Sequence, residues 1–373
     1  MNITRIRIWR VQPPHDAWNL VSIETRSGLT GWGEFTGSGH EAAAAAIVTG
    51  AAPHLAGRDA LDAEALLSPF RSFRYPPVDD KIATVAWSAI AQALWDLRGQ
   101  AFGQPLCRLL GGMVKPVRLY ANLNRGLFRD RSPEGHARHA EEAMDRGFAY
   151  AKCTPFDGLT PAIPDGATLD VPMERLRRAA AAAGAERIAV DCHCRFSPPA
   201  ARKMLEAAKA LGRFAWIEDI LSPVHRERFR ELRHAFPETV WAGGEETRSL
   251  GMAAAVLTGP DRPDIFMPDV KYICGPDEYA AIVRLAGQCG CLLYPHNPSG
   301  PISLAFSAHL AALGGDCLVE YPFMAVPGQE TLTAPEEPVE NGWYYLRDAP
   351  GLGMAPSRRC LDDHGTVLHE TTA

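Results

Sequence analysis

The sequence predicts an α/β protein in which a small α+β domain precedes a closed barrel of alternating strands and helices. Three observations support this fold class: a hairpin pattern near the start, eight short apolar segments separated by helical stretches after residue 116, and ionisable residues at the ends of six of those segments. A chain of 373 residues is long enough for two domains, or for one barrel with an addition. Eight strand–helix units in roughly 200 residues fit a closed parallel barrel.

The pattern of residues 1–115 indicates an α+β domain. Residues 20–25 and 29–34 flank a three-residue loop that ends at Gly28, where a hairpin needs a positive φ. Residues 82–97 carry apolar side chains at helical spacing. We place the domain boundary near residues 112–116, just before Pro116.

The following residues alternate between short strands and helices. The candidate strands are residues 117–123, 149–153, 187–193, 214–218, 240–245, 265–269, 291–295 and 317–320. Helices rich in Ala, Leu and Arg lie between them, including residues 173–183, 200–211 and 277–286. This alternation favours a parallel sheet. We assign residues 116–325 to the barrel and residues 326–373 to a C-terminal segment that packs back on the first domain.

Six of the candidate strands finish on an ionisable residue. These residues are Asp191, Glu218, Glu245, Asp269, His296 and Glu320. Successive differences between their numbers are 27, 27, 24, 27 and 24, as expected for one strand–helix unit per step. The strand C-termini of a barrel form the face where active sites lie. Capping of the next helix by acidic residues would explain one or two of the six, but not all of them in register.

Three carboxylates fall on neighbouring strands, the third, fourth and fifth. Asp191, Glu218 and Glu245 would repel one another in a mostly apolar barrel mouth unless a cation held them. An all-oxygen donor set favours a hard ion, Mg²⁺ or Mn²⁺. Three protein ligands leave positions for substrate oxygens, so the ion could stabilise the enolate form of a bound carboxylate.

Two histidines are candidate proton-transfer groups. Asp269 and His296 end the sixth and seventh strands, so the carboxylate can hold one ring nitrogen and leave the other free as a base. His193 lies two positions after Asp191 and therefore projects to the same side of the third strand. Strands three and seven lie opposite each other in an eight-stranded barrel, so the two histidines would flank a substrate. The alternative for each histidine is a role in packing.

Several functional classes are excluded by composition and hydropathy. The formal net charge of −6 and the absence of a dense Lys/Arg run exclude an electrostatic nucleic-acid binder. No apolar stretch approaches 18 residues, and the first residues lack the features of a signal peptide, so we expect a soluble, cytoplasmic protein. Nine cysteines without metal or disulfide spacing indicate buried small hydrophobes in a reducing compartment.

The motifs, in this order and spacing, resemble the enolase superfamily and, within it, the mandelate racemase/muconate lactonizing enzyme-like group. Gly31-Trp32-Gly33-Glu34 and residues 93–99 through 109–112 look like the N-terminal capping domain of that family. The resemblance implies a capping domain on a modified (β/α)7β barrel. It also implies that Asp191, Glu218 and Glu245 are metal ligands, that Asp269 and His296 are the general-base dyad, and that Glu320 hydrogen-bonds the enediolate.

The second strand departs from the usual family pattern of two lysines. Lys152 keeps the first lysine, but Thr154 stands in place of the second and cannot serve as a base near neutral pH. The Asp-x-His arrangement at Asp191 and His193, with residues 294–301, instead resembles acid sugar dehydratases such as the galactonate and mannonate dehydratases. That resemblance makes His193 the acid toward the β-hydroxyl and His296 the base, with Lys152 adding positive charge near the substrate carboxylate.

The resemblance therefore implies Mg²⁺-dependent dehydration of an aldonic or aldaric acid, through a metal-stabilised enediolate, to a 2-keto-3-deoxy acid. Two alternatives remain open. One is a racemase or epimerase of an α-substituted carboxylate with His193 and His296 as its two bases, and the other is a non-catalytic barrel that binds sugar acids. We expect a small-molecule carboxylate ligand and a homo-oligomer, with no nucleic-acid or membrane partner.

Candidate specificity residues lie in loops near the barrel mouth. In the family that this sequence resembles, N-terminal loops close over the site and determine specificity. The candidate loop here is residues 13–19, in which His15 and Trp18 are the candidate substrate-binding residues. Asn122 and Asn124 on the first strand, and Arg195 after His193, could bind hydroxyls or a distal carboxylate. A diacid substrate would follow if Arg195 reached the pocket, whereas a surface ion pair is its alternative role.

Overall fold

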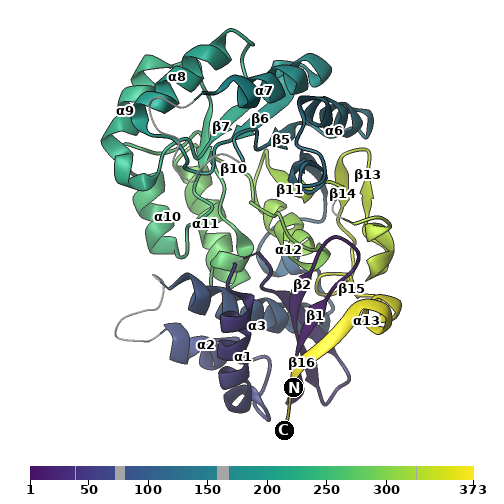
Figure 1. Ribbon diagram of the computed structural model, residues 1–373. Helices are drawn as coiled ribbons and strands as arrows, with labels where there is room; N and C mark the ends of the chain where they lie inside the picture. The colour runs from purple at the N-terminus through teal and green to yellow at the C-terminus, as the bar shows by residue number, and fades with distance from the viewer. Residues whose placement is uncertain (38, 72–79, 158–167, 325) are drawn as a thin grey trace.

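The structure, a computed structural model, describes residues 1–37, 39–71, 80–157, 168–324 and 326–373. An antiparallel sheet with helices forms one end of the molecule, and a β/α barrel forms the other, as Figure 1 shows from purple to green. The two chain ends lie together in the smaller domain (Figure 1). This arrangement confirms the expected fold class.

The capping domain is built on a four-stranded antiparallel sheet in the order β16-β1-β2-β3. Its strands are β1 (Ile3–Val11), β2 (Trp18–Thr25), β3 (Thr30–Glu34) and β16 (Gly365–Thr372). The helices of this domain are α1 (Glu41–Leu55), α2 (Ala63–Arg71) and α3 (Lys81–Ala101). Gly28 has a φ of 83° in the loop between β2 and β3, which confirms the predicted hairpin.

Strand β3 lies so close to α3 that two of its positions require glycine. A Cβ at Gly31 would lie 2.1 Å from the carbonyl oxygen of Ala93, and one at Gly33 would lie 2.0 Å from that of Ala89. Neither backbone oxygen can move without breaking the helix. The Gly-Trp-Gly pattern therefore permits a direct strand-on-helix contact, which fixes Glu34 at the end of β3.

Eight parallel strands form the barrel. They are β4 (Pro116–Asn122), β5 (Ala151–Cys153), β6 (Ile188–Asp191), β7 (Trp216–Glu218), β8 (Trp241–Gly243), β9 (Ile265–Phe266), β10 (Leu292–Leu293) and β11 (Leu318–Pro322). Each strand from β4 to β10 pairs with the next in parallel, and β11 pairs with β4. The amide of Glu320 donates to the carbonyl of Pro295 (3.3 Å), which joins β11 to the end of β10.

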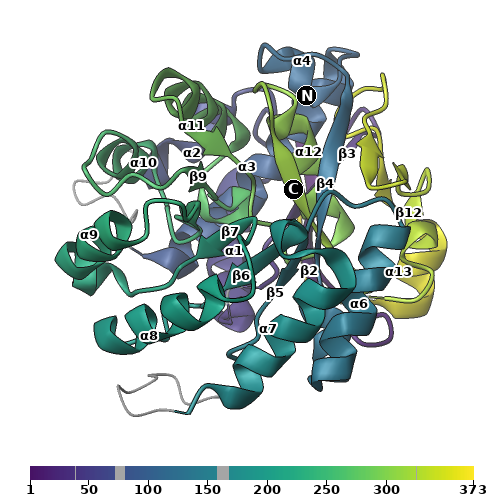
Figure 2. The ribbon, with the colours of Figure 1, turned by 90° about the horizontal axis from the view of Figure 1, so that it is seen from above.

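Helices surround these strands (Figure 2). Following β4 to β10 in turn, they are α6 (Pro133–Asp145), α7 (Asp170–Ala183), α8 (Pro198–Lys209), α9 (Arg226–Ala235), α10 (Leu250–Leu257), α11 (Pro276–Gln288) and α12 (Pro301–Ala311). Shorter helices are α4 (Leu106–Leu109), α5 (Asn124–Leu127) and α13 (Arg358–His364), with 3₁₀ turns at Ala185–Arg187, Pro223–His225, Val270–Tyr272 and Gln329–Leu332. Seven strand–helix pairs and the final strand β11 give a (β/α)7β barrel.

The C-terminal segment contacts both domains. Strand β14 (Trp343–Tyr345) pairs antiparallel with β4, and β16 pairs antiparallel with β1. The short strands β12 (Thr333–Ala334), β13 (Val339–Glu340) and β15 (Ala355–Pro356) complete this segment. The segment thus pairs with the capping domain through β16 and extends the barrel sheet through β14, while the domain boundaries stay a prediction.

Apolar side chains fill the interior of the barrel and the capping domain. Tyr120, Trp216, Ile265 and Met267 belong to the cluster inside the barrel. All nine cysteines are free thiols, six of them buried and three partly buried, in line with their predicted role as small hydrophobes. In the described part of the chain no helix has the length and hydropathy needed to cross a membrane. A cytoplasmic location stays a prediction.

Several strands end earlier than the sequence predicts. His193 lies beyond β6 with a left-handed φ of 49°, so the argument that it shares a strand face with Asp191 is wrong. Glu245 lies two residues past β8, after Gly244 with a φ of 106°. These left-handed residues turn the chain out of the strand where the apolar pattern alone would extend it. Glu320, in contrast, lies in the middle of β11 rather than at its end.

Candidate active site

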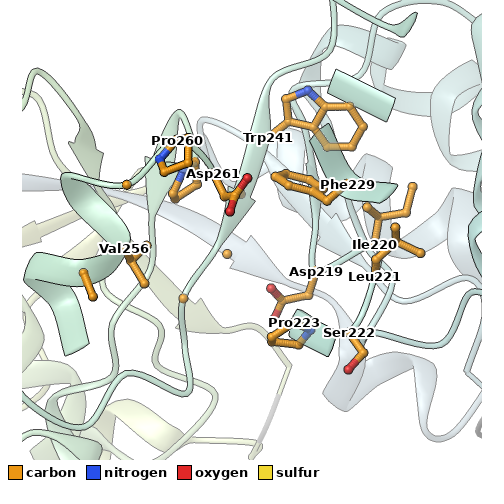
Figure 3. Close-up of a pocket in the computed structure, with 16 residues that line it drawn as sticks. Asp219, Ile220, Leu221, Ser222, Pro223, Phe229, Trp241, Val256, Pro260 and Asp261 are labelled. Carbon is orange, nitrogen blue, oxygen red and sulfur yellow. The ribbon is translucent and has the colours of Figure 1, made fainter. Parts of the chain in front are cut away.

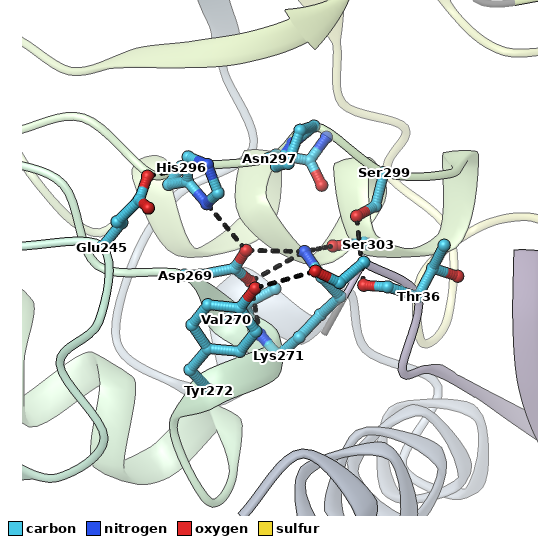
Figure 4. Close-up of polar contacts among 12 residues, drawn as sticks. Thr36, Glu245, Asp269, Val270, Lys271, Tyr272, His296, Asn297, Ser299 and Ser303 are labelled. Atoms are coloured by element: carbon cyan, nitrogen blue, oxygen red, sulfur yellow. Dashed lines mark hydrogen bonds and ion pairs between the residues drawn. The ribbon is translucent and has the colours of Figure 1, made fainter. Parts of the chain in front are cut away.

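The dyad of Asp269 and His296 is formed as predicted. The two residues make an isolated parallel bridge beyond β9 and β10, and Nδ1 of His296 lies 2.9 Å from Oδ2 of Asp269 (Figure 4). Asp269 is fully buried, and His296 is 8% exposed. Burial alone would lower the pKa of His296, but the charges of Glu245 and Glu320 raise it to about 9. The carboxylate thus orients the ring through Nδ1, and Nε2, which faces Glu245 at 3.1 Å, is the nitrogen left for proton transfer once Glu245 turns aside.

Lys271 completes this group and was missed from the sequence. Its Nζ lies 2.8 and 2.7 Å from the two carboxylate oxygens of Asp269 and 3.4 Å from Oγ of Ser303 (Figure 4). Burial alone would raise the pKa of Asp269, but the charge of Lys271 and the hydrogen bond to His296 lower it to about 2. Asp269 is therefore an anion held between an ammonium and an imidazole.

Lys152 lies at the centre of the carboxylates on the opposite side of the site. Its Nζ is 3.0 Å from Glu218, 3.0 Å from Glu320 and 3.4 Å from Asp191. All four side chains are buried. Burial raises the pKa of Glu218 to about 7, with Lys152 opposing the shift and Asp191 adding repulsion. One ammonium group thus forms ion pairs with three buried carboxylates, so this part of the site carries excess negative charge.

The three proposed metal ligands suit a hard cation by their chemistry. Asp191 and Glu218 are register partners on β6 and β7, and Glu245 lies two residues after the next strand, β8. Their side chains nevertheless do not converge: across the described residues, no three His, Cys, Asp or Glu side chains surround one point that could hold an ion. Glu245 instead places Oε2 3.1 Å from Nε2 of His296. Each carboxylate faces the nearest cation, and assignment of the three as metal ligands stays a prediction.

His193 bridges two carboxylates despite lying outside the strand. Its Nε2 is 3.1 Å from Asp191, and its Nδ1 is 3.0 Å from Asp157, which follows β5. Burial alone would lower the pKa of His193, but the charge of Asp191 and the hydrogen bond to Asp157 raise it to about 11. With both ring nitrogens facing carboxylates, His193 is an imidazolium that can donate a proton. Asp157 has no sequence signal of its own because it lies in a loop.

The two asparagines at the end of the first barrel strand form hydrogen bonds with other residues of the site. The side-chain amide of Asn122 donates to Oε1 of Glu320, and its own oxygen accepts from the backbone amide of Asn124 (2.9 Å). Thr154 is fully buried and donates to Oδ1 of Asn124 (2.7 Å). Asn122 is 3% exposed. Contact of either asparagine with substrate stays a prediction.

The other predicted specificity residues are separated in the structure. Arg195 places Nε 3.1 Å from Asp157, so it lies beside His193 at the barrel mouth. His15 is exposed, with a φ of 77°. Trp18 begins β2 and is only 2% exposed. A Cβ added at Gly300 would lie 2.8 Å from Cγ of Trp18, so the ring packs directly against this glycine. Trp18 therefore packs between the two domains, and contact of Trp18, His15 or Arg195 with substrate stays a prediction.

A buried carboxylate of the capping domain contacts the barrel directly. Glu34 accepts hydrogen bonds from the backbone amides of Gly300 (2.7 Å) and Ser303 (2.8 Å), at the N-terminus of α12. These amides have no partner within the helix, so the carboxylate caps α12. The same helix supplies Ser303 to Lys271, which links the domain interface to the dyad. The sequence motif contained Glu34, but nothing in it showed this role.

An apolar pocket of about 200 Å³ lies apart from these groups, between α9 and α10 (Figure 3). Phe229, Trp241 and Val256 line it. Asp219 lies at its edge with a left-handed φ of 43°, and burial raises the pKa of this carboxyl well above its usual value. None of the predicted site residues lines this pocket, so we place the chemistry at the strand ends.

Comparison with known proteins gives a consistent assignment. Residues 12–111 match the family described as mandelate racemase / muconate lactonizing enzyme, N-terminal domain, and residues 135–360 match the family described as enolase C-terminal domain-like. The D-galactonate dehydratase of Verminephrobacter eiseniae is 29% identical over 366 residues, covering 95% of this chain and 92% of the relative. That of Ralstonia nicotianae is 28% identical over 364 residues, with the same coverage.

Solved structures agree with this assignment along the whole chain. The mandelate racemase/muconate lactonizing enzyme from Jannaschia sp. CCS1 superposes with a TM-score of 0.84 at 25% identity, covering 99% of both chains. An enolase protein from the environmental genome sequencing of the Sargasso Sea gives 0.84 at 27% identity, covering 100% of this chain and 99% of that one. The chain therefore belongs to the enolase superfamily, in its mandelate racemase and muconate lactonizing enzyme group.

Proposed function

We propose that this protein is a hydro-lyase that removes water from a sugar acid and yields a 2-keto-3-deoxy acid. The observation that carries the proposal is the pair of histidines at the barrel mouth, one fixed by Asp269 for proton abstraction and the other held between two carboxylates as a proton donor. Relatives named D-galactonate dehydratase, which align with 95% of the chain, support a hydro-lyase activity of this kind.

In the proposed reaction His296 accepts the proton α to the substrate carboxylate at Nε2, while Asp269 keeps Nδ1 occupied. His193 donates a proton to the 3-hydroxyl, which leaves as water. The C2 proton and the C3 hydroxyl are thus lost together, and the enol that remains tautomerises to the 2-keto acid. Lys152 places positive charge beside Glu320, where charge develops on the substrate carboxylate.

Asp191, Glu218 and Glu245 would hold the divalent ion that this family uses, Mg²⁺ or Mn²⁺. The ion would supply Lewis-acid stabilisation of negative charge on the substrate carboxylate. The all-carboxylate donor set and its excess negative charge support this choice of ion. Ligand identity and homo-oligomeric assembly stay predictions.

The racemase alternative uses the same two histidines in a different way. It requires His193 to act as a second base, but the pKa of His193 is raised to about 11, above the value of about 9 for His296, so His193 holds its proton more firmly. Thr154 in place of a second lysine removes the other base that could serve that face. The arrangement therefore favours elimination over inversion.

One experiment separates the candidate functions. A panel of aldonic and aldaric acids is incubated with the protein and Mg²⁺ in D₂O and followed by ¹H NMR. Accumulation of a 2-keto-3-deoxy acid supports the lyase, and deuterium in recovered substrate and its epimer supports the racemase. Mg²⁺ binding without loss of any α-proton across the panel supports the non-catalytic barrel and contradicts the proposal.

A further inference from the structure

Three arginines gather beside His193 at the barrel mouth. We define the arginine cluster as Arg131, in the loop before α6, Arg175 on α7, and Arg195 after β6, together with Asp157 after β5. Oδ1 of Asp157 lies 3.1 Å from Arg195, and Oδ2 lies 3.7 Å from Arg131. Arg175 donates to the backbone carbonyls of Pro155 (2.9 Å) and Asp157 (3.3 Å). The cluster thus contains three guanidinium cations and one carboxylate.

Part of the hydrogen-bonding capacity of this cluster is unused. Nη1 of Arg131 and Nε of Arg175 are buried and have no hydrogen-bond partner among the described residues. The 3.7 Å separation between Arg131 and Asp157 is too long for a hydrogen bond. Buried donors without acceptors cost free energy, and like charges close together add repulsion. The positive charge of Arg131 also lowers the pKa of Arg175, after the larger effect of burial.

The cluster is nonetheless open enough to receive a ligand. The side chains of Arg131 and Arg195 are 26% and 23% exposed, and that of His193 is 33% exposed. The exposed ring of Phe128 supports the guanidinium of Arg131, whose Cζ lies 5.1 Å from the ring centroid. The guanidinium is therefore held in place at a partly solvated surface.

The position of His193 fixes where the far end of a substrate would lie. If His193 protonates the 3-hydroxyl, as in the proposed function, the carbons beyond C3 would extend past that ring on the side away from Asp191, Glu218 and Glu245. The group that contacts His193 on the side away from Asp191 is Asp157, which belongs to the arginine cluster. Asp157 in turn contacts Arg195 and Arg131, so a six-carbon acid that extends past His193 on this side would approach the arginines with its last carbon.

We propose that the arginine cluster binds a second carboxylate at the distal end of the substrate, so that the preferred substrate is a sugar diacid rather than a monoacid. This inference rests on the proposed function and specifies its substrate class. A carboxylate matches the paired N–H donors of a guanidinium, and it would balance the excess positive charge of the cluster. A neutral terminal hydroxyl would leave both the paired N–H donors and the excess positive charge of the cluster unmatched.

The test compares acids that differ only at the last carbon, galactarate with galactonate and glucarate with gluconate, by kcat/KM for keto-acid formation with Mg²⁺. For the configuration that the enzyme accepts, we expect the diacid to exceed the monoacid by about tenfold or more. In Arg195→Gln and Arg131→Gln, this ratio should fall toward one, with the loss for the diacid mainly in KM. Arg138→Gln is the matched control, since Arg138 is exposed and pairs with Asp130, and it should keep the wild-type ratio.

The failures of this inference and of the proposed function are distinguishable. Dehydration of a monoacid at equal or higher kcat/KM than its diacid overturns the inference and leaves the proposed function standing. Higher kcat/KM for a 6-phospho-aldonate than for the diacid also overturns it, because the distal group would then be a phosphate. Absence of dehydration for every acid contradicts the proposed function itself. Circular dichroism and Mg²⁺ binding of each variant establish that it is folded, and an unchanged ratio in both folded arginine variants overturns the inference.

Discussion

Oε2 of Glu245 lies 3.1 Å from Nε2 of His296, so the nitrogen proposed to take the substrate proton faces a carboxylate proposed to hold the metal. On the other side of the ring, Nδ1 faces Asp269 at 2.9 Å. Glu245 must turn away from the ring before Nε2 can face a substrate. Binding of a divalent ion by Glu245 and release of the base would then be one event.

We expect Glu218→Gln to weaken Mg²⁺ binding before it affects any other property. The substitution keeps the shape of the side chain and removes one of the anionic oxygens of the proposed donor set. The dissociation constant for Mg²⁺, measured by isothermal titration calorimetry, should rise by at least about tenfold. Glu141→Gln, on an exposed position of α6, should leave it unchanged. Equal Mg²⁺ affinity in wild type and Glu218→Gln would remove Glu218 from the ligand set.

We expect His296→Asn to abolish exchange of the α-proton, because the ring nitrogen that accepts it is gone. Exchange measured by ¹H NMR in D₂O should fall by about 10²-fold or more. Mg²⁺ affinity should persist, since His296 is not among the proposed ligands. Exchange at the wild-type rate would move the base elsewhere, to Lys152 or His193.

We expect Glu34→Gln to lower the free energy of unfolding by about 1–3 kcal/mol. The carboxylate accepts from the amides of both Gly300 and Ser303, and a glutamine side chain offers only one oxygen to these two buried donors. Urea unfolding followed by circular dichroism measures the change. Glu340→Gln, on an exposed position of β13, serves as the control. A free energy equal to that of the wild type would show that Glu34 does not hold the two domains together.

Glu337 gives a stability difference that depends on pH. This carboxyl is 6% exposed and accepts from Tyr321 and Gln329 (both 3.2 Å), and burial raises its pKa from 4.5 to about 7. The nearby charge of Glu330 contributes in the same direction. Between these two pH values the folded state keeps a proton that the unfolded state has lost, so Glu337 lowers stability as pH rises through that window.

Glu337→Gln removes this titration. Relative to wild type, the variant should therefore be more stable at pH 8 than at pH 5 by up to about 3 kcal/mol. Urea unfolding of both proteins at the two pH values gives the comparison, and any hydrogen-bond change that does not depend on pH cancels in the difference. The same stability difference at both pH values would show that Glu337 ionises in the folded protein as it does in the unfolded chain.

The fold could be predicted because its signals are local. The Gly28 turn, the apolar strands and the helical spacing between them depend on residues near one another in the chain, and the spacing from Asp191 to Glu320 counts strand–helix units. Strand ends were less predictable. The left-handed residues at His193 and Gly244 depend on how loops pack at the barrel mouth, and the apolar pattern does not encode that packing.

Site residues that directly follow strands could be predicted from the sequence. Residues whose position depends on contacts between distant segments were harder to predict. Asp269 and His296 follow neighbouring strands, so their pairing could be expected. Lys271 was missed because a lysine two residues beyond a strand usually reaches solvent, and its burial depends on the packing of α3 and α12 against the turn that carries it. The packing of Trp18 against Gly300 could not be predicted for the same reason, since this contact exists only once the two domains meet.

The proposed reaction requires His296 to remove the proton α to the carboxylate of a sugar acid with loss of the neighbouring hydroxyl. Purified protein, Mg²⁺ and the best acid of the panel are followed by ¹H NMR in D₂O, beside His296→Asn. We expect a 2-keto-3-deoxy acid to accumulate with wild type and not with the variant. Recovery of deuterated substrate and its epimer without keto acid, or equal turnover by His296→Asn, would contradict it.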